Sequence, residues 1–254
     1  IADAVGASAQ DRPDLVVFPE LFVQGYPPRD LLERESFVAE GLGALEQLCA
    51  VSRSFPGVGI LTGFALPNQD PHGKGLSNSA VLICDGGVVF HQNKSLLPTY
   101  DVFDETRYFD PAQSVAVFEF KGETLGITVC EDAWNHTDLL PRRLYGRDPV
   151  EELVRLGATL LVNVSGSPFH ADKEKLRHQI MGDHARRHAV PFVFVNQVGG
   201  NDELVFDGGN EFRNFDLKSL KYQSEQIALI DYNYEGNQVY LHPDKRRTYK
   251  QYVR

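Results

Sequence analysis

The chain reads "SVAVFEFKGETLGITVCEDAW" over residues 114–134, and this stretch predicts two strands joined by a polar turn. Both halves are apolar, and Lys121-Gly122 marks the turn between them. The second strand ends at Cys130, which two acids, Glu131 and Asp132, follow directly. Because nearby carboxylates keep a thiol protonated, Cys130 is either an inert core residue or a nucleophile whose other neighbours compensate for the acids.

The rest of the chain alternates short apolar runs with helical stretches. Strands are expected at residues 14–20, 58–66, 158–168, 191–200 and 225–234. A second hairpin is expected at 77–95, because Asp85-Gly86-Gly87 separates two apolar runs. Helical periodicity predicts helices at residues 1–8, 29–52, 148–157 and 173–189.

The predicted strands do not alternate polar and apolar residues, so neither of their faces is expected to be exposed to solvent. They predict either one sheet covered on both sides or two sheets packed face to face with helices outside. A helix that opens an α/β domain usually follows a strand, so an N-terminal strand is expected ahead of Ile1 and is missing from these residues. No linker or repeat is evident, and we expect one domain over residues 1–254.

Composition limits the classes of function. The 254 residues are 42% hydrophobic and 24% charged, as in ordinary globular α/β proteins. A net charge of −10 argues against nucleic acid or an anionic membrane as the main partner. The three cysteines are widely spaced, which predicts no disulfide framework and a cytoplasmic location. Two of them, Cys49 and Cys84, are expected to be small core residues.

Two charged residues at other strand ends bear on the thiol: Lys94 can compensate for the acids beside Cys130, and Glu20 can supply a base. Lys94 closes the second hairpin, where its ammonium group can favour the thiolate and stabilise an oxyanion. Glu20 ends the apolar strand at 14–20 and is the candidate general base. Glu20, Lys94 and Cys130 therefore predict a base, a cation and a nucleophile drawn from three separate strand ends.

The same residues carry a family resemblance. The order "FPE", Lys94 before "LPTYDVFDE", and "CEDAW" strongly resembles the nitrilase, or carbon–nitrogen hydrolase, superfamily with its Glu-Lys-Cys triad. With "PELFVQGYPPRDLL", "LVNVSGSPFH" and "VFVNQVGGNDELVFDGG", the chain looks like the glutaminase domains of glutamine-dependent NAD synthetases up to about residue 209. The resemblance implies a four-layer α-β-β-α sandwich and hydrolysis of glutamine to glutamate and ammonia through a thioester on Cys130.

The resemblance also implies roles for individual residues. Glu20 would act as general base, Lys94 would support the oxyanion, and Glu105 would position Lys94 and the substrate. The positions that match the family's glutamine-binding residues are Tyr26, Tyr100, Glu131, Ser167 and Lys173. Glu131 would receive the α-ammonium group of the substrate. Lys173 stands where an arginine is often found, which favours a single point-charge contact over a bidentate one.

The resemblance implies partners as well. In the family, ammonia passes to a second domain that uses ATP and Mg to amidate deamido-NAD to NAD. The Ser-Gly-Gly-x-Asp-Ser loop of that synthetase domain is not found in this sequence. No cofactor is therefore expected for the glutaminase domain itself, and a homo-oligomer is expected by resemblance only.

Two other classes of function stay open. One is a free-standing amidase that acts on another small amide. The other is a non-enzymatic interaction protein, against which the intact Glu20, Lys94 and Cys130 set argues. A metal site is not expected, since the histidines of the 173–189 helix are better explained as a polar helix face. These histidines and their neighbour are His170, His178, His184 and His188.

Overall fold

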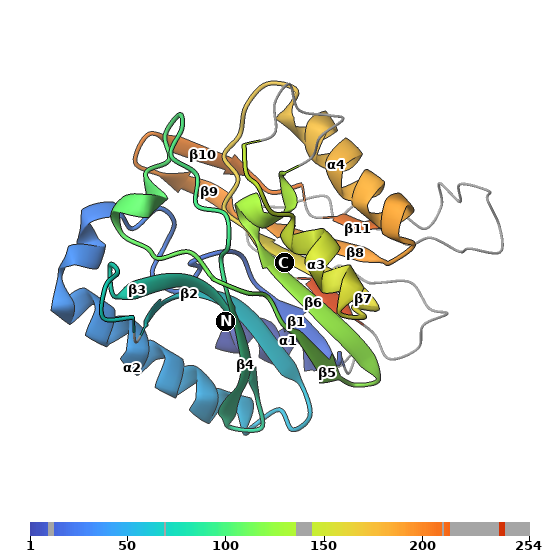
Figure 1. Cartoon of the computed structure of the whole chain (residues 1–254). Helices are drawn as coiled ribbons and strands as arrows, with labels where there is room; N and C mark the ends of the chain where they lie inside the picture. Colours follow the sequence, from blue (N-terminus) through green and yellow to red (C-terminus); the bar gives the residue numbers. More distant parts are fainter. Residues whose placement is uncertain (10–12, 69, 136–143, 210, 214–238, 242–254) are drawn as a thin grey trace.

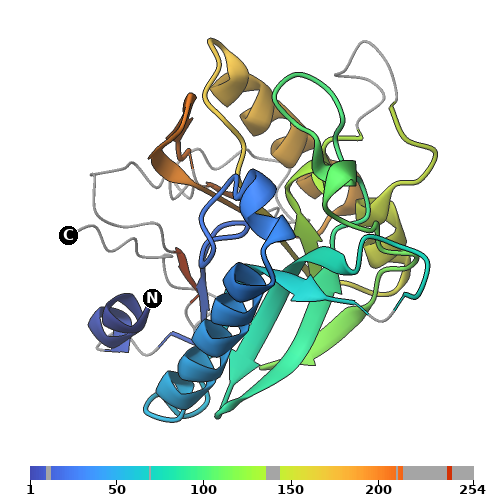
Figure 2. The same ribbon diagram turned by 90° about the vertical axis from the view of Figure 1, so that its left-hand side faces the viewer.

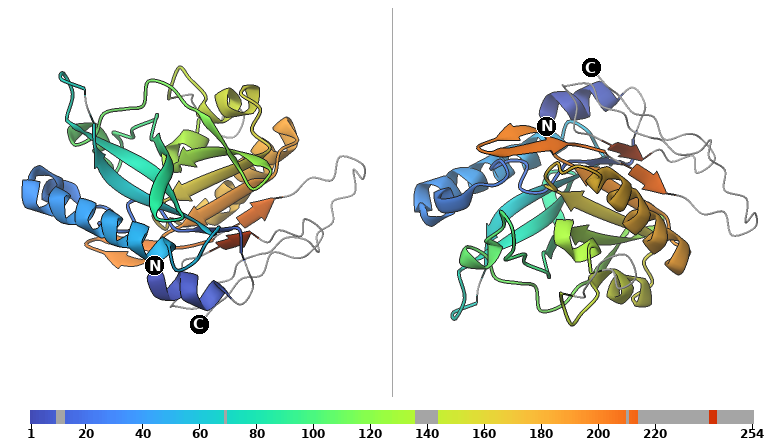
Figure 3. Two further views of the ribbon diagram at one scale, coloured as in Figure 1. Left: turned by 90° about the horizontal axis from the view of Figure 1, so that it is seen from below. Right: turned by 90° about the horizontal axis from the view of Figure 1, so that it is seen from above.

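The computed structural model describes residues 1–9, 13–68, 70–135 and 144–209, and strand backbone at 211–213 and 239–241. Two five-stranded mixed sheets face each other, and helices lie on their outer sides (Figure 1). Seen along the sheets, the layers follow one another as helix, sheet, sheet, helix (Figure 3). Of the two arrangements that the strands allowed, the structure therefore has two packed sheets, in the four-layer order that the family resemblance implied.

The first sheet has the order β12-β1-β2-β3-β4. Its strands are β12 (Val239–Leu241), β1 (Leu15–Val17), β2 (Gly59–Pro67), β3 (Leu76–Cys84) and β4 (Gly87–Asn93). β1 runs parallel to β2, whereas β2, β3 and β4 form an antiparallel meander. The outer face is covered by α1 (Ala2–Ser8) and α2 (Glu35–Ser52), which lie beside each other in Figure 2.

The second sheet has the order β11-β8-β7-β6-β5. Its strands are β11 (Glu211–Arg213), β8 (Phe192–Asn196), β7 (Leu160–Ser165), β6 (Glu123–Val129) and β5 (Val117–Phe120). β6, β7 and β8 are parallel, so their carboxyl ends meet at one edge of the sheet. The outer face is covered by α3 (Pro149–Arg155) and α4 (Lys173–His188).

The main core lies between the two sheets. Val17, Leu61 and Leu82 of the first sheet pack in one cluster with Val129 and Val162 of the second. The other sides of the central strands are buried under the helices, so both faces of these strands are dry. This explains the continuous apolar runs in the sequence. It also leaves the strand ends as the places where polar side chains can gather.

The predicted helix at 29–52 is wrong as one continuous element. A short 3-10 helix, η2 (Arg29–Glu33), is followed by an extended Arg34 (φ −96°, ψ 114°) before α2 begins. Leu32 is buried in a cluster with Tyr26 and Phe109. This packing overrides the local helical propensity.

Two of the predicted strands need correction, and a third lies outside the residues that the structure describes. The regular part of the strand predicted at 14–20 is only β1. The strand predicted at 191–200 is divided into β8 and β9 (Val198–Asn201), and β9 pairs with β10 (Leu204–Asp207), a hairpin that the sequence analysis did not predict. The strand predicted at 225–234 lies outside the described residues.

Two further observations concern membrane-spanning helices and the cysteines. In the part of the chain that the structure describes, no helix is both long and apolar enough to cross a membrane. Cys49, Cys84 and Cys130 are free thiols.

Candidate active site

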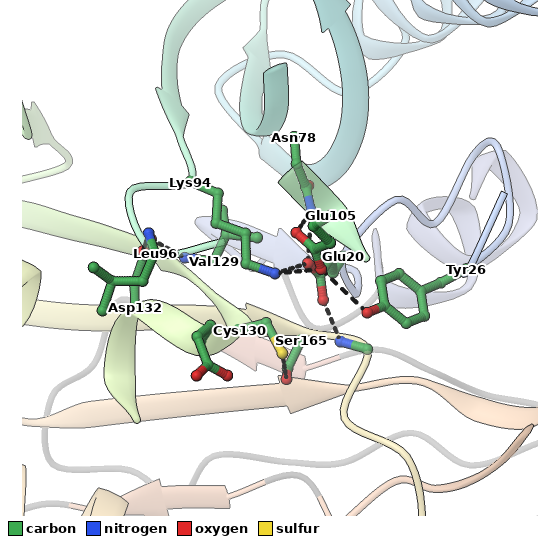
Figure 4. Close-up of polar contacts among 12 residues, drawn as sticks. Glu20, Tyr26, Asn78, Lys94, Leu96, Glu105, Val129, Cys130, Asp132 and Ser165 are labelled. Carbon is green, nitrogen blue, oxygen red and sulfur yellow. Dashed lines mark hydrogen bonds and ion pairs between the residues drawn. The ribbon is translucent and has the colours of Figure 1, made fainter. Parts of the chain in front are cut away.

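The three predicted reactive residues meet at one end of the sandwich (Figure 4). Glu20 lies just after β1, Lys94 directly after β4, and Cys130 directly after β6. Glu20 and Lys94 are completely buried, and Cys130 is 5% exposed. The two sheets thus bring together a carboxylate, an ammonium group and a thiol from segments far apart in the sequence.

Lys94 is shared between two carboxylates. Its Nζ donates hydrogen bonds of 2.7 Å to Oε1 of Glu20 and of 2.7 Å to Oε1 of Glu105. Asn78 adds a second bridge, because its Nδ2 donates to Oε1 of Glu20 at 2.7 Å and to Oε2 of Glu105 at 3.4 Å. Asn78 was not predicted from the sequence. One cation facing two acids leaves a net negative charge, which Asn78 helps to hold in place.

This shared charge sets the protonation of the cluster. Burial alone would lower the pKa of Lys94, but attraction to Glu105 and Glu20 raises it well above its usual value. Lys94 is therefore a permanent cation. Burial raises the pKa of Glu105 to about 7, although attraction to Lys94 opposes the rise. The carboxyl of Glu105 therefore changes its charge near neutral pH.

Cys130 is a protonated thiol in this resting arrangement. Burial raises its pKa, Glu20 raises it further, and Lys94 opposes them only in part. Lys94 opposes the effect of the adjacent Glu131, as the sequence predicted, but it does not outweigh burial and Glu20. A thiol that acts as a nucleophile needs a base, and the part of Glu20 as that base stays a prediction.

The backbone around Cys130 presents its side chain to the site. Cys130 has a φ of +42°, in the left-handed region, at the start of the 3-10 helix η4 (Cys130–Ala133). A non-glycine residue in this region is uncommon, and such strain concentrates at functional sites. The hydroxyl of Ser165, at the end of β7, donates to Sγ of Cys130 at 3.1 Å. Ser165 was missed because nothing in the sequence pairs the ends of β6 and β7.

The second acid after Cys130 turns away from the thiol. Asp132 accepts backbone N–H bonds from Ser95 at 2.9 Å, Leu96 at 2.8 Å and Val129 at 3.0 Å. Burial raises its pKa to about 6, although these backbone donors oppose the rise. Asp132 thus joins the segment that carries Lys94 to the turn that carries Cys130. From the sequence, Asp132 was evident only as a neighbour of the thiol.

The loop after β7 supports the base. The backbone N–H of Gly166 donates to Oε2 of Glu20 at 2.8 Å. A Cβ atom on Gly166 would lie 2.8 Å from the ring of Tyr26, so only glycine fits there. Tyr26 is 3% exposed and its hydroxyl donates to Oε1 of Glu105 at 3.2 Å. The structure therefore places Tyr26 behind the acids, and its part in substrate binding stays a prediction.

Glu131 lies on the other side of Cys130, facing two tyrosines. It is 5% exposed and accepts hydrogen bonds from the hydroxyls of Tyr100 and Tyr145. Tyr100 was predicted to lie near the substrate, whereas Tyr145 was not predicted at all. Burial raises the pKa of Glu131, while Lys94, the two tyrosines and Lys173 oppose the rise.

Lys173 begins α4 and approaches the same region. Its Nζ lies 5.3 Å from the centre of the Trp134 ring, a cation–π contact. Burial lowers its pKa, although attraction to Cys130 and Glu131 opposes this. Lys173 is thus a cation that lies close enough to Cys130 and Glu131 to interact with them electrostatically.

Ser167 is fixed by a buried arginine and an asparagine. Arg177 is completely buried, and its Nη2 donates to the carbonyls of Ser167 at 3.0 Å and Pro168 at 2.9 Å. Its Nη1 forms an ion pair of 2.7 Å with Asp207. Asn196 holds both the N–H and the carbonyl of Ser167. Arg177 was missed, although a charged residue on the apolar stripe that contains Ile180 is a signal the sequence offered.

The histidines of α4 have other contacts. Nε2 of His184 donates to the carbonyl of Ala133 at 2.9 Å, and its ring stacks on Phe192. His184 thereby connects α4 to the turn that follows Cys130. Within the described ranges, no group of three or more His, Cys, Asp or Glu side chains is arranged to hold a metal ion.

The two-sheet sandwich and the buried Glu20, Lys94 and Cys130 at its strand ends agree with the comparison to a known family. The family model of carbon–nitrogen hydrolases matches residues 1–210. The chain belongs to the carbon–nitrogen hydrolase family.

Curated relatives narrow the comparison. Over 232 residues the chain is 39% identical to the glutamine-dependent NAD(+) synthetase of Synechocystis sp. (strain ATCC 27184 / PCC 6803 / Kazusa), covering 89% of this chain and 41% of that protein. Over 249 residues it is 36% identical to the enzyme of the same name from Thermotoga maritima, covering 95% of this chain and 40% of that protein. The chain thus spans about two fifths of the length of these relatives.

Solved structures agree with the fold. A glutamine-dependent NAD+ synthetase from Acinetobacter baumannii, in complex with ADP, superposes with a TM-score of 0.69 at 34% identity, covering 84% of this chain and 37% of that one. An amidase from Nesterenkonia sp. AN1 also gives a TM-score of 0.69 at 23% identity, covering 84% of this chain and 76% of that one. The amidase shares the fold.

Proposed function

We propose that this chain hydrolyses glutamine to glutamate and ammonia through a thioester on Cys130. The observation that carries the proposal is the buried cluster in which Glu20 and Glu105 share Lys94 beside a protonated thiol. Glu131, a nearly buried carboxylate beside the same thiol, gives a place for the α-ammonium group of an amino-acid substrate. The similarity to glutamine-dependent NAD synthetases supports the same substrate.

The first half of the reaction forms the thioester. Sγ of Cys130 attacks the side-chain amide carbon of glutamine, and Glu20 takes the thiol proton. Lys94 and the backbone N–H of Glu131 stabilise the negative oxygen of the tetrahedral intermediate. The C–N bond then breaks, and the proton held by Glu20 passes to the nitrogen, so that neutral ammonia leaves.

The second half releases glutamate. A water molecule attacks the thioester carbon, and Glu20 takes one of its protons. The C–S bond breaks, and the proton returns from Glu20 to the sulfur, which restores the starting thiol. Glu105 positions Lys94 for both halves through the hydrogen bond of 2.7 Å that joins the two groups in the structure. Tyr26, Tyr100, Ser167 and Lys173 complete the binding site.

The ammonia supplies the ATP-dependent amidation of deamido-NAD to NAD. That step belongs to a synthetase domain that uses ATP and Mg, as expected if this chain corresponds to about two fifths of its relatives. An amidase that acts on another small amide is the second candidate, favoured by the fold shared with the Nesterenkonia enzyme. Glutamine and a simple amide such as propionamide separate the two, because only glutamine can use Glu131.

Covalent labelling tests the proposal. The protein is incubated with 6-diazo-5-oxo-norleucine, and its intact mass and peptide map are measured, together with the release of glutamate from glutamine. A single adduct on Cys130, absent from the variant Cys130→Ala and retained in Cys84→Ala, is the expected result. Glutamine turnover retained by Cys130→Ala would overturn the mechanism. An unlabelled Cys130 that still reacts with iodoacetamide would instead favour a different amide substrate.

A further inference from the structure

Glu131 is an unusual buried carboxylate because, among the described residues, its side chain accepts hydrogen bonds from neutral groups. Its hydrogen-bond donors are two phenol groups, Tyr100 at 2.8 Å to Oε1 and 2.9 Å to Oε2, and Tyr145 at 3.0 Å to Oε1. The carboxylates of the reactive cluster, in contrast, contact the ammonium group of Lys94 directly. A phenol favours the ionised carboxylate without cancelling its charge. The charge of Glu131 is therefore held in place and left available to a ligand.

The two tyrosines are donors that keep their protons. Burial raises the pKa of Tyr100, and the charge of Glu131 raises it further. The same two causes, in the same order, raise the pKa of Tyr145. Both hydroxyls therefore remain protonated at any pH at which the protein works, and both can only donate to Glu131. Their removal would leave this nearly buried carboxylate without its observed donors.

Tyr145 is held in place by its own backbone. Nδ2 of Asn135 donates to the carbonyl of Tyr145 at 3.1 Å and to that of Arg147. Arg147 in turn pairs with Glu152 of α3 and donates to the carbonyl of Ala112 at 2.7 Å. The phenol of Tyr145 is thus fixed from the α3 side of the site, whereas Tyr100 reaches Glu131 from the loop after β4. The carboxylate is gripped from two separate segments.

The grip is uneven between the two oxygens. Oε1 receives both hydroxyls, and Oε2 receives only the longer branch of the Tyr100 bond. A carboxylate oxygen can accept about two hydrogen bonds, so Oε2 keeps the larger free capacity. A ligand ammonium group would therefore bind to Oε2, because the hydrogen bonds to Oε1 fix the orientation of the carboxylate.

We infer that Tyr145 is a specificity-determining positioning residue, which with Tyr100 holds Glu131 ionised and directed so that the site selects amides bearing an α-ammonium group. The inference rests on the proposed function and deepens it. Tyr145 acts through Glu131 and does not itself touch the reacting atoms. Its loss should weaken the binding of glutamine and leave the chemistry at Cys130 intact.

Two substrates that differ by one group test the inference in the full-length protein. Glutamine carries the α-ammonium group, whereas glutaramate has the same amide and carboxylate without it. For Tyr145→Phe we expect KM for glutamine to rise about tenfold, as for the loss of one hydrogen bond to a charged group, with kcat changed less than twofold. The constants for glutaramate should not change. In the matched control Tyr108→Phe, which removes a phenol donor to the exposed Asp30, both substrates should behave as in the wild type.

A double variant separates positioning from folding. In a Glu131→Gln background, Tyr145→Phe should have no further effect on glutamine, because its only action is through the carboxylate. An equal loss with both substrates, or no loss with either, would overturn the inference. If the wild type itself shows no preference for glutamine over glutaramate, the proposed glutamine specificity fails and the inference falls with it. A strong wild-type preference that Tyr145→Phe leaves intact would sink the inference alone.

Discussion

The two sides of the site handle buried charge in opposite ways. On the strand side, Glu20 and Glu105 contact the ammonium group of Lys94 at 2.7 Å each, so the protein itself supplies a cation in direct contact with both acids. On the loop side, the carboxylate of Glu131 accepts its hydrogen bonds, among the described residues, from the neutral phenols of Tyr100 and Tyr145, which do not cancel its charge. The first arrangement suits catalytic groups that must keep the same geometry in every turnover. The second suits a carboxylate whose ion-pair partner is supplied by the substrate.

The two sides also differ in how they are built. Glu20 and Lys94 stand at the ends of strands whose positions the central core fixes, and both are fully buried. Tyr100 and Tyr145 come from connecting segments, and Tyr100 is 42% exposed. Reactive groups on rigid elements and recognition groups on loops are a common division in α/β proteins. Substitutions on the strand side should therefore change kcat, whereas those on the loop side should change KM.

The sharpest way to break the comparison is to remove the shared cation. In Lys94→Met, kcat for glutamine should fall about a thousandfold or more, because the oxyanion loses its ammonium group and the two acids lose their common partner. The exposed Lys121→Met is the matched control and should leave kcat unchanged. Circular dichroism must show that Lys94→Met is folded. A folded variant with a normal kcat would mean that the strand-side charge has no part in the chemistry.

The pH dependence of kcat/KM sharpens the same comparison. Burial raises the pKa of Glu105 to about 7, so this carboxyl loses its charge, and its ion pair with Lys94, as the pH falls below about 7. Activity should therefore decline on the acid side of pH 7. Glu105→Gln, which cannot titrate, should lower kcat about 10- to 100-fold and remove this decline. An unchanged acid limb in the variant would assign the titration to another group.

The stability of the folded chain should depend on Glu105 in the opposite sense to activity, because it should fall as the pH rises. The pKa of Glu105 is raised by folding, so between about pH 4.5 and about 7 the folded chain binds more protons than the unfolded chain. The stability contributed by Glu105 is therefore lost as the pH rises through this window. The free energy of unfolding of Glu105→Gln, relative to the wild type, should increase from pH 5 to pH 8. A constant or falling difference in denaturant titrations would contradict the raised pKa.

The sequence predicted the strand side better than the loop side. Glu20, Lys94 and Cys130 each follow an apolar strand, and strand ends converge in layered α/β folds, so their meeting could be anticipated. The residues that hold these three side chains in place could not be anticipated from the sequence. Asn78 lies 58 residues from Glu20, and Ser165 lies 35 residues from Cys130, so these contacts depend on the pairing of strands and sheets.

The loop side was harder for a related physical reason. Tyr145 reaches Glu131 from a segment in which Asn135 donates to the carbonyls of Tyr145 and Arg147, and these contacts leave no periodic pattern in the sequence. The break at Arg34 was likewise invisible, since the residues around it are good helix formers and the burial of Leu32 decides the outcome. Apolar periodicity reports which faces are buried, whereas single polar contacts between distant segments require the fold itself.

The smallest expected effect tests whether the loop side offers a cation as well as an anion. Lys173 is only partly buried, and its Nζ lies against the Trp134 ring, 5.3 Å from its centre. A single partly solvated lysine should contribute a modest contact to the α-carboxylate of glutamine, so Lys173→Ala should raise KM about three- to tenfold with little change in kcat. The exposed Lys175→Ala, on the same helix, is the matched control. An unchanged KM in Lys173→Ala would remove this lysine from the binding site, and a large loss of kcat would place it with the reactive cluster instead.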